Sequence, residues 1–494
     1  MSAKSVLILI GLVFLPSLLI GLHPATSESF QYDAVVSQLS AREGIVANAW
    51  DEPEAYRLRR LHPPLLSYII RLNNSIFGDD AFGSRVFSIV FGSLTCLVVA
   101  ISIVVLLPPL PGRFVGAVFG GWLICLLPVH LYVSRTSNWD AAYGFFAATA
   151  LLCLASYVKN RVTIRLYAAA LSGSLAFLTS ELGLSLVPAF LFVMFWDARS
   201  GRLPRVFHRW TGVLLFVVVF LALVWPAGVF KLDLTRTLLY RWRDSVAEQR
   251  NLPWYMFYVM LFREAPAFTL AMVLGILATI LPPVLRKSSR PAHDIPSSSV
   301  FIASLPFWIY VATAFLLSLK QRLVYVHHIA DMLPPLVVGV GAGVVAWTGS
   351  LGKPARNLVL ALGIATVALS IIATANPDPK IVGPQEHPGF LGVRDILRDH
   401  PGSRIYCYDT VVLKFYLPEA RIEGGASRYW TPEKIEEARR EKYDFLVFDR
   451  AVLNDDYPTA EIIIEAFAPD YTVGWVIKHR RSGEPVAWIL RPER

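Results

Sequence analysis

The chain has 494 residues, of which 55% are hydrophobic and 17% charged, and its mean hydropathy is +0.50. This composition excludes a soluble globular protein of that length, because the apolar residues come in runs of about 18 or more, long enough to cross a bilayer. The net charge of +9 does not indicate nucleic-acid binding, since Lys and Arg do not cluster on one soluble segment. Membrane lipid or a phosphate ligand is the expected partner, and no nucleic acid.

The apolar runs predict a polytopic α-helical membrane protein with about eleven spans, the first of them a retained helix instead of a cleaved signal peptide. With the N-terminus inside, the inner segments, 197–210 among them, hold 14 Lys and Arg in 54 residues, and the outer ones hold 14 in 112. The positive-inside rule then puts the first long loop, 23–81, outside a plasma or inner membrane. The predicted spans are 5–22, 82–107, 114–133, 140–158, 166–179, 184–196, 211–230, 265–285, 300–319, 329–347 and 357–374.

From Asn376 the sequence becomes charged and mixed, which predicts a domain boundary. We expect a transmembrane domain at 1–375 and a small α/β domain at 376–494, which an odd number of spans makes extracytoplasmic. Its predicted elements are strands at 403–408 and 443–448, a helix at 432–442 and a β pair at 472–479 and 485–491. Three of the four cysteines fall in predicted spans, so a disulfide framework is excluded.

Two carboxylates in the predicted outer loops are candidates for catalysis. Asp33 follows Phe30-Gln31-Tyr32, and Asp140 lies near the end of the polar stretch that begins at Ser134. Such a carboxylate can act as a general base that takes the proton from an attacking hydroxyl. The structural alternatives are a helix cap for Asp33 and an interfacial ion pair with Arg135 for Asp140. The predicted topology puts both carboxylates on one side of the membrane, as a shared site requires.

Basic residues near the same boundary suit a leaving phosphate. His62 precedes Pro63-Pro64-Leu65, and Lys320 and Arg322 precede Tyr325. A phosphate departs unprotonated when cations hold it, so this chemistry needs one base and several cations, whereas a glycosidase needs two carboxyl groups. The alternative for each basic residue is snorkelling to lipid headgroups.

Four further residues carry open alternatives. Glu181, in a polar turn after a predicted span, is either a site residue or part of a structural turn. His327, His328 and Asp331 can share one helix face, which would allow a metal site, although a structural pair of one His with Asp331 is favoured.

The order of these motifs resembles the GT-C membrane glycosyltransferases, specifically the relatives of protein O-mannosyltransferases and of lipid A aminoarabinose transferases. The resemblance covers roughly 1–375 and rests on the Asp33 loop with its His62-Pro63-Pro64-Leu65, on the stretch 77–85, on the short loop at Asp140, and on the basic stretch that leads to Leu333-Pro334-Pro335-Leu336. Relatives usually carry two adjacent acidic residues where this chain has only Asp33, so Glu28 is the reserve base.

The resemblance implies a GT-C fold and an inverting transfer of a sugar from a polyprenyl-phosphate donor to an acceptor hydroxyl at the outer face. Asp33 and Asp140 would be catalytic. The implied substrate-binding residues are His62, Arg135, Glu181, Lys320, Arg322 and Tyr325. Some relatives bind a divalent metal and others need none, so the resemblance leaves the cofactor open.

The competing interpretation is a transporter or a non-catalytic sensor or scaffold. Transporters place functional charges near the membrane midplane, on broken helices in paired halves. The candidate charges of this chain lie in loops and at span ends, and its sequence shows no two-fold symmetry. We therefore predict a glycosyltransferase, whose sugar, acceptor and lipid length the sequence does not specify.

Overall fold

The chain divides into two compact units, one made of the helices up to Thr348 and one made of the elements from Phe390 onward. Each unit is described by itself below. The computed structural model describes residues 3–22, 38, 65–78, 82–107, 112–136, 139–201, 203–224, 297–321, 332–348, 389–407, 413–414, 416–424, 432–449, 459–478 and 483–493.

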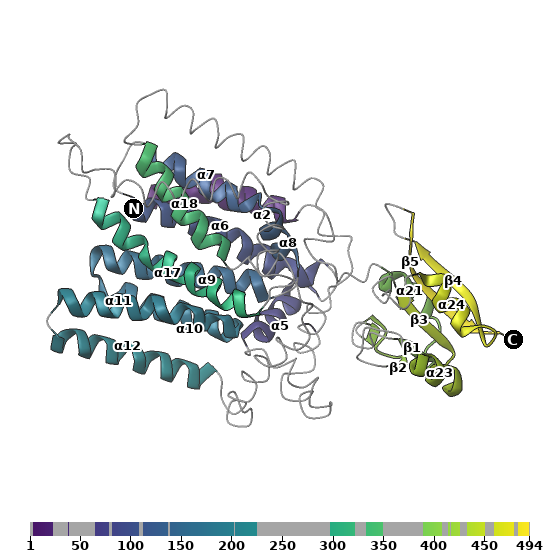
Figure 1. Ribbon diagram of the computed structural model, residues 1–494. Helices are drawn as coiled ribbons and strands as arrows, with labels where there is room; N and C mark the ends of the chain where they lie inside the picture. The colour runs from purple at the N-terminus through teal and green to yellow at the C-terminus, as the bar shows by residue number, and fades with distance from the viewer. Residues whose placement is uncertain are drawn as a thin grey trace. The chain divides into compact units, whose positions relative to one another are not determined.

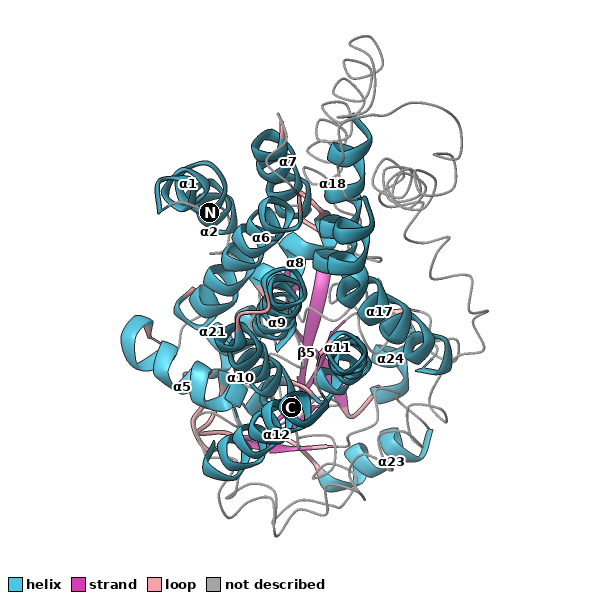
Figure 2. Ribbon diagram, turned by 90° about the vertical axis from the view of Figure 1, so that its left-hand side faces the viewer, coloured by secondary structure: helices cyan, strands magenta, loops and turns pink. Residues whose placement is uncertain are grey.

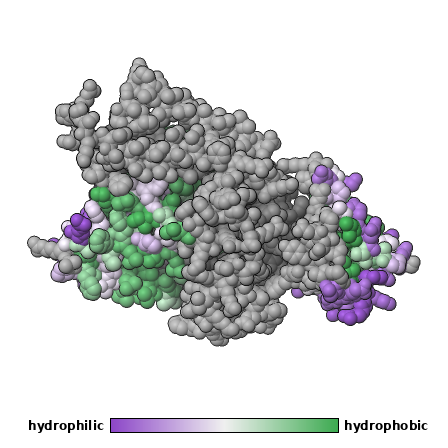
Figure 3. Space-filling view, viewed as in Figure 1, coloured by the Kyte–Doolittle hydropathy of each residue, from purple (hydrophilic) through white to green (hydrophobic). Residues whose placement is uncertain are grey.

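The first unit is a bundle of long helices (Figure 1). Its described surface in Figure 3 is mainly hydrophobic, as contact with lipid requires. Its elements are α1 (Ala3–Leu9), η1 (Ile10–Phe14), α2 (Leu15–Leu22), α5 (Leu65–Phe77), η2 (Gly83–Arg85), α6 (Val86–Leu106), α7 (Arg113–Cys125), α8 (Pro128–Arg135), α9 (Trp139–Asn160), α10 (Thr163–Thr179), η3 (Glu181–Leu186), α11 (Val187–Ser200), α12 (Leu203–Val224), α17 (Ser297–Gln321) and α18 (Leu333–Thr348).

The bundle has the character of a multi-pass membrane protein. Within the described residues, five helical stretches are long and apolar enough to cross a membrane, and a sixth is added if α7 and α8 are one bent span. Two shorter apolar helices, Thr163–Thr179 and Ile302–Ala314, accompany them. The count of eleven spans stays a prediction, because predicted spans 265–285 and 357–374 lie outside the described residues.

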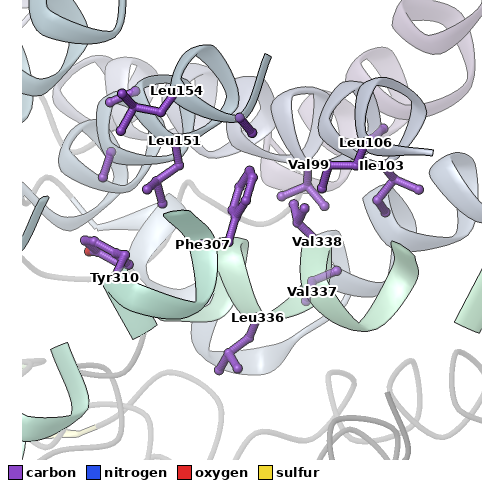
Figure 4. Packing of buried hydrophobic residues seen from close by; sticks show 14 of the residues in the cluster. Val99, Ile103, Leu106, Leu151, Leu154, Phe307, Tyr310, Leu336, Val337 and Val338 are labelled. Carbon is purple, nitrogen blue, oxygen red and sulfur yellow. The ribbon is translucent and has the colours of Figure 1, made fainter. Parts of the chain in front are cut away.

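Helix α9 lies at the centre of the bundle, between α6, α10, α11 and α17 (Figure 2). Its sequence is rich in alanine, and small side chains let neighbouring helices approach closely. Phe307 of α17 points toward α9 and α6 in Figure 4, where the core also holds leucine and valine side chains of α18. The predicted spans 82–107 and 140–158 correspond to α6 and α9, which are long and apolar enough to cross a membrane, whereas the predicted span 166–179 corresponds to the shorter apolar helix α10.

The predicted span 114–133 is not one continuous helix. The chain forms two helices there, α7 and α8, which are bent by 66° relative to each other. Leu127 between them is extended, and Pro128 begins α8. Proline lacks an N–H and disfavours a helical conformation in the residue before it, so the first helix ends and a new one starts at Pro128.

Helix α5 was not predicted. It packs against α6 and α10 through buried Leu66 and Ile70. The buried Asn73 side chain donates a hydrogen bond from Nδ2 to the backbone oxygen of Gly83, at 2.7 Å. A side chain at Gly83 would lie 2.3 Å from the backbone oxygen of Phe77, so only glycine fits. These contacts fix the start of α6 against α5.

Two ends of the bundle are named here for their buried carboxylates. At the Asp140 end, α6 and α9 begin and α8 and α10 end. At the Asp197 end, α9 and α11 end and α12 begins. The segment 197–210, predicted to lie inside between two spans, is found at this second end and is mostly helical, because α11 continues to Ser200 and α12 starts at Leu203. Its location on the inner side stays a prediction.

The reason for this extension is a buried ion-pair cluster around Asp197, which is 3% exposed. Oδ1 accepts a hydrogen bond from Nη1 of Arg161 at 2.7 Å, and Oδ2 accepts from Nη1 of Arg209 at 2.7 Å. The Tyr157 hydroxyl and the Trp210 indole N–H also donate to Oδ2, at 2.8 and 3.2 Å. Three helices, α9, α11 and α12, and the loop residue Arg161 thus meet at one carboxylate, both of whose oxygens accept hydrogen bonds.

Lys159 also links two helices at the Asp197 end, α9 and α6. Its Nζ donates to the backbone oxygens of Val105, Leu106 and Leu107 at 2.7, 3.3 and 3.4 Å. These oxygens belong to the last turn of α6, where backbone acceptors have no partner within the helix. A cation there also interacts favourably with the helix dipole.

The second unit is a five-stranded mixed sheet with helices, in the strand order β2-β1-β3-β5-β4. β2, β1 and β3 are parallel, and β5 pairs antiparallel with both β3 and β4. The strands and helix that the sequence predicted are confirmed to within two residues. The elements are α21 (Phe390–Leu397), β1 (Arg404–Cys407), β2 (Arg421–Glu423), α23 (Pro432–Glu441), β3 (Phe445–Asp449), α24 (Ala460–Phe467), β4 (Tyr471–Lys478) and β5 (Pro485–Pro492).

The described surface of this unit is largely hydrophilic, in contrast to the helical unit (Figure 3). Nη2 of Arg404, the first residue of β1, donates to Oε2 of Glu423, the last residue of β2, at 2.9 Å, and the Tyr443 hydroxyl donates to the same oxygen at 3.2 Å. The hydrogen bond from Arg404 lowers the pKa of the Glu423 carboxyl. Burial raises the pKa of the nearby Tyr406 to about 12. This ion pair links the edge strand β2 to β1.

Candidate active site at the Asp140 end

Four of the predicted site residues lie in described elements: Arg135, Asp140, Glu181 and Lys320. The structure brings the first three to the Asp140 end. The remaining candidates lie outside the described residues, so their predictions are unchanged: Asp33, His62, Arg322, Tyr325, His327, His328 and Asp331.

Asp140 is the second residue of α9 and only 4% exposed. A carboxylate in the first turn of a helix is favoured by the helix dipole. Its burial is nevertheless costly in an apolar bundle, because an ionised group taken out of water must be compensated by polar neighbours. A buried carboxylate at a helix end, next to a polar loop, is a candidate for chemistry.

Arg135 ends α8 and has an identified structural contact. Its Nη2 donates a hydrogen bond to the backbone oxygen of Ile20 at 2.6 Å. Ile20 lies in the last turn of α2, so this cation satisfies one of the carbonyls that the helix leaves open. Arg135 therefore ties α2 to α8 beside Asp140, whatever role it has toward a substrate.

A tyrosine pair organises the same end and was missed by the sequence reasoning. The Tyr143 hydroxyl of α9 lies 2.8 Å from the Tyr310 hydroxyl of α17 and 3.3 Å from Oγ of Ser185. It also donates to the backbone oxygen of Leu182 at 3.0 Å. Tyrosine inside an apolar span needs a hydrogen-bond partner, and this was the available signal. The partner, far away in sequence, was not predictable.

The pair fixes the turn that holds Glu181. Leu182 and Ser185 both belong to η3, the short 3₁₀ helix that Glu181 begins. Tyr143 lies three residues after Asp140, so the start of α9 and the Glu181 turn are held together. The prediction that these two regions share one end of the molecule agrees with this contact.

Lys320 lies in the last turn of α17, ten residues after Tyr310. Ten helical residues rise by about 15 Å, so the helix continues past the tyrosine pair in the direction of the Asp140 end. Its backbone position is thus compatible with a site at this end. The hydrogen bond between the Tyr310 and Tyr143 hydroxyls holds α17 against α9.

The start of α6 contributes buried polar residues that the sequence reasoning did not assign to the site. Ser84 and Ser88 are fully buried and Arg85 is 6% exposed. Phe91 of α6 contacts Phe145 and Phe146 of α9, each at 5.4 Å between ring centroids. Both helices run in the same direction from this contact.

The aromatic contact sets the register of the two helices. Counting back six residues from Phe91 leads to Arg85, and counting back six from Phe146 leads to Asp140. The two charged residues therefore lie at one level on neighbouring helices. Among the described residues no group of three or more His, Cys, Asp or Glu is arranged to hold a metal ion.

The comparisons with known proteins agree with this architecture. Residues 61–225 match the family model described as dolichyl-phosphate-mannose-protein mannosyltransferase. This match agrees with the resemblance recognised in the motifs: part of the chain is similar to a membrane glycosyltransferase family, and the helical bundle is that of a multi-pass membrane protein. No curated protein matches the chain.

The solved structures that it resembles include two of ArnT from Cupriavidus metallidurans. The structure bound to undecaprenyl phosphate is 13% identical, with a TM-score of 0.58. The structure in the apo state is 14% identical, with a TM-score of 0.60. Each comparison covers 99% of this chain and 98% of the other. At this identity the likeness shows a shared fold.

Proposed function

We propose that the protein transfers a sugar from a polyprenyl-phosphate donor to an acceptor hydroxyl at the outer face of the membrane. The observation that carries the proposal is the buried Asp140 at the end of a bundle whose fold matches, over 99% of the chain, a structure bound to undecaprenyl phosphate. The mannosyltransferase family match over 61–225 supports a sugar as the transferred group. The acceptor is a lipid, glycan or protein hydroxyl.

In the proposed reaction the acceptor oxygen attacks the anomeric carbon of the sugar as the bond to the phosphate oxygen breaks, with inversion at that carbon. Asp33 takes the proton of the acceptor hydroxyl as general base. Asp140 stabilises the positive charge that develops on the sugar ring or orients the acceptor. The phosphate leaves without protonation when cations hold it.

The proposed phosphate ligands are basic residues of the first outer loop and of the end of α17 with the stretch that follows it. His62, Lys320 and Arg322 supply positive charge, and the Tyr325 hydroxyl supplies a further donor. Arg135 and Glu181 complete the set at the Asp140 end as donor and acceptor for the substrate. A charge on the bridging oxygen grows in the transition state, so these cations contribute to the rate as well as to binding.

The test is steady-state transfer by the purified protein, with undecaprenyl-phosphate-mannose and undecaprenyl-phosphate-aminoarabinose as donors and released undecaprenyl phosphate as the readout. We expect Asp33→Asn to lower turnover by roughly 10²–10⁴-fold at unchanged expression. Lys320→Ala or Arg322→Ala should each lower kcat/KM about ten- to a hundredfold, since charge-assisted hydrogen bonds to the phosphate are lost. Solute uptake into proteoliposomes without any transfer would instead support a transporter.

The proposed sidedness is tested separately. Cysteines introduced at Asp51 and Ser427 should react with an impermeant thiol reagent added to intact cells, whereas one at Ser200 should not. Labelling at Ser200 would contradict an outer-face site.

A further inference from the structure

Two buried hydroxyl groups at the Asp140 end have no internal hydrogen bond. Ser84 and Ser88 are both fully buried, and Oγ of each lacks a hydrogen-bond partner. Other buried serines of α6 behave differently: Oγ of Ser93 donates to the oxygen of Ile89 at 2.8 Å, and Oγ of Ser102 donates to that of Val98 at 2.7 Å. A serine in a helix can satisfy itself in this way, so the two exceptions require another explanation.

The position of the two serines gives that explanation. Ser84 and Arg85 lie in η2, which leads directly into α6, and Ser88 lies in the first turn of α6. The two serines are four residues apart in this continuous helical stretch, about one turn, and therefore lie on one face beside Arg85. Gly92, one turn further, is so close to α8 that an added Cβ would lie 2.1 Å from Oγ of Ser134. The serine face is thus turned toward α8 and α9. The register set by Phe91 brings Asp140 to the same level.

The polar groups at this level suit a neutral ligand that carries several hydroxyls. Arg85 provides donors, Asp140 provides acceptors, and each serine hydroxyl can donate or accept. A phosphate alone would be disfavoured beside the Asp140 carboxylate, because two anions repel each other in a buried site. A sugar hydroxyl can donate to the carboxylate and accept from the guanidinium at the same time.

We propose that Ser84, Arg85 and Ser88, with Asp140, form the subsite that binds hydroxyl groups of the transferred sugar. This inference rests on the proposed function and assigns its substrate subsite. The lipid phosphate is bound elsewhere, by the basic loop residues. The serines therefore recognise the donor by its sugar and make no contact with the sugar-free carrier.

The experiment compares the sugar-bearing donor with the sugar-free lipid. Ser84→Ala and Ser88→Ala should each raise the donor KM about three- to tenfold, the loss expected for one hydrogen bond to a neutral hydroxyl. The inhibition constant of undecaprenyl phosphate, measured in the same assay, should stay within about twofold of wild type. Ser102→Ala is the matched control, because it removes a buried hydroxyl of the same helix that bonds only its own backbone.

Thermal unfolding without ligand provides a second readout. Because neither hydroxyl has an internal partner, the Ser84→Ala and Ser88→Ala proteins should be at least as stable as wild type. A lower melting temperature would show that the hydroxyls have a structural role and would overturn the subsite.

The failure modes can be separated. An unchanged donor KM in both variants, with normal transfer by wild type, would overturn the subsite and leave the proposed function intact. An equal rise in the donor KM and in the inhibition constant of undecaprenyl phosphate would show that the serines bind the lipid phosphate, and would overturn the sugar assignment. Wild-type protein that neither transfers nor is inhibited would overturn both.

Discussion

The two ends of the helical bundle both bury a carboxylate, but they treat it differently. At one end, Asp197 is bonded through both oxygens to two arginines, a tyrosine and a tryptophan. At the other, Asp140 is buried at the level of Ser84 and Ser88, whose hydroxyls have no internal partner. Arg85 is buried at that level as well.

The difference separates a structural carboxylate from a candidate catalytic one. A closed cluster such as that of Asp197 has no capacity left for a ligand, and its value lies in joining α9, α11 and α12. An end with buried polar groups that the fold itself does not satisfy has a stability cost, which is retained when a ligand uses those groups. Burial of a charge alone does not indicate function; the state of its surroundings does.

The largest expected effect concerns activity at the Asp140 end. Asp140→Asn removes the charge at nearly constant volume, so transfer should fall by roughly 10²–10⁴-fold while the melting temperature changes little. The measurement is turnover of a lipid-linked sugar donor beside thermal unfolding in the same detergent. A lower melting temperature with normal turnover in the folded fraction would show that Asp140 has a structural role, like Asp197, and no role in catalysis.

The opposite outcome is expected for Asp197. Asp197→Ala leaves Arg161 and Arg209 without their shared anion, which should destabilise the bundle by about 3–5 kcal/mol. Thermal unfolding measures this loss, and kcat of the protein that remains folded should equal that of wild type within about twofold. Arg199→Ala, which replaces a cation of the last turn of α11 outside the cluster, is the control. A fall in kcat for Asp197→Ala but not for Arg199→Ala would show that Asp197 also contributes to catalysis, and would contradict the assignment of a purely structural role.

A smaller effect should follow from the tyrosine pair, which is part of the scaffold at the Asp140 end. Tyr143→Phe keeps the ring and removes the hydroxyl that joins Tyr310 to the backbone of Leu182. We expect a loss of about 1–3 kcal/mol, because buried polar groups lose a partner. Tyr167→Phe is the control, since the Tyr167 ring packs edge-on against Phe216 at 5.7 Å. Equal losses of stability in Tyr143→Phe and Tyr167→Phe would show that the hydrogen bonds of the Tyr143 hydroxyl do not stabilise the Asp140 end.

The sequence predicted this molecule best where apolar runs decide the structure. α6 and α9 were predictable because a bilayer selects long apolar helices. Proline shows the limit: Pro306 lies inside the continuous helix α17, whereas Pro128 marks the bend between α7 and α8. Neighbouring helices decide whether a proline breaks a span, and their positions cannot be read from a local pattern.

The candidate site was predictable only in part, for a related reason. Asp140 and Glu181 were found because polar residues interrupt apolar runs at the ends of spans. Tyr143 and Tyr310 meet across 167 residues of sequence, and no local signal joins them. The missing hydrogen-bond partners of Ser84 and Ser88 have no signal in the sequence and require coordinates to detect.

The smallest expected effect lies outside the bundle, in the ion pair of Arg404 with Glu423. The hydrogen bond from Arg404 lowers the pKa of Glu423 in the folded state, so its stabilising contribution is present above the unfolded pKa of about 4.3 and is lost as the pH falls through the lower folded value. In Glu423→Gln this pH dependence of stability should disappear.

Hydrogen exchange of the β1 and β2 amides in the full chain measures this stability. At pH 7 the variant should exchange only about two- to threefold faster than wild type, since both partners are partly exposed to solvent. As the pH falls below about 4.3 and through the lower folded pKa, the two proteins should converge, because wild-type Glu423 then becomes protonated. Glu419→Gln, which changes an exposed carboxylate without a described ion pair, should leave exchange unaltered at both pH values. A constant difference between Glu423→Gln and wild type across this range would mean that packing, and not the charge, holds the edge strand. The contrast with Asp197 would then be one of burial: a buried carboxylate holds helices together strongly, whereas a partly exposed one adds little to a sheet that its backbone pairing already defines.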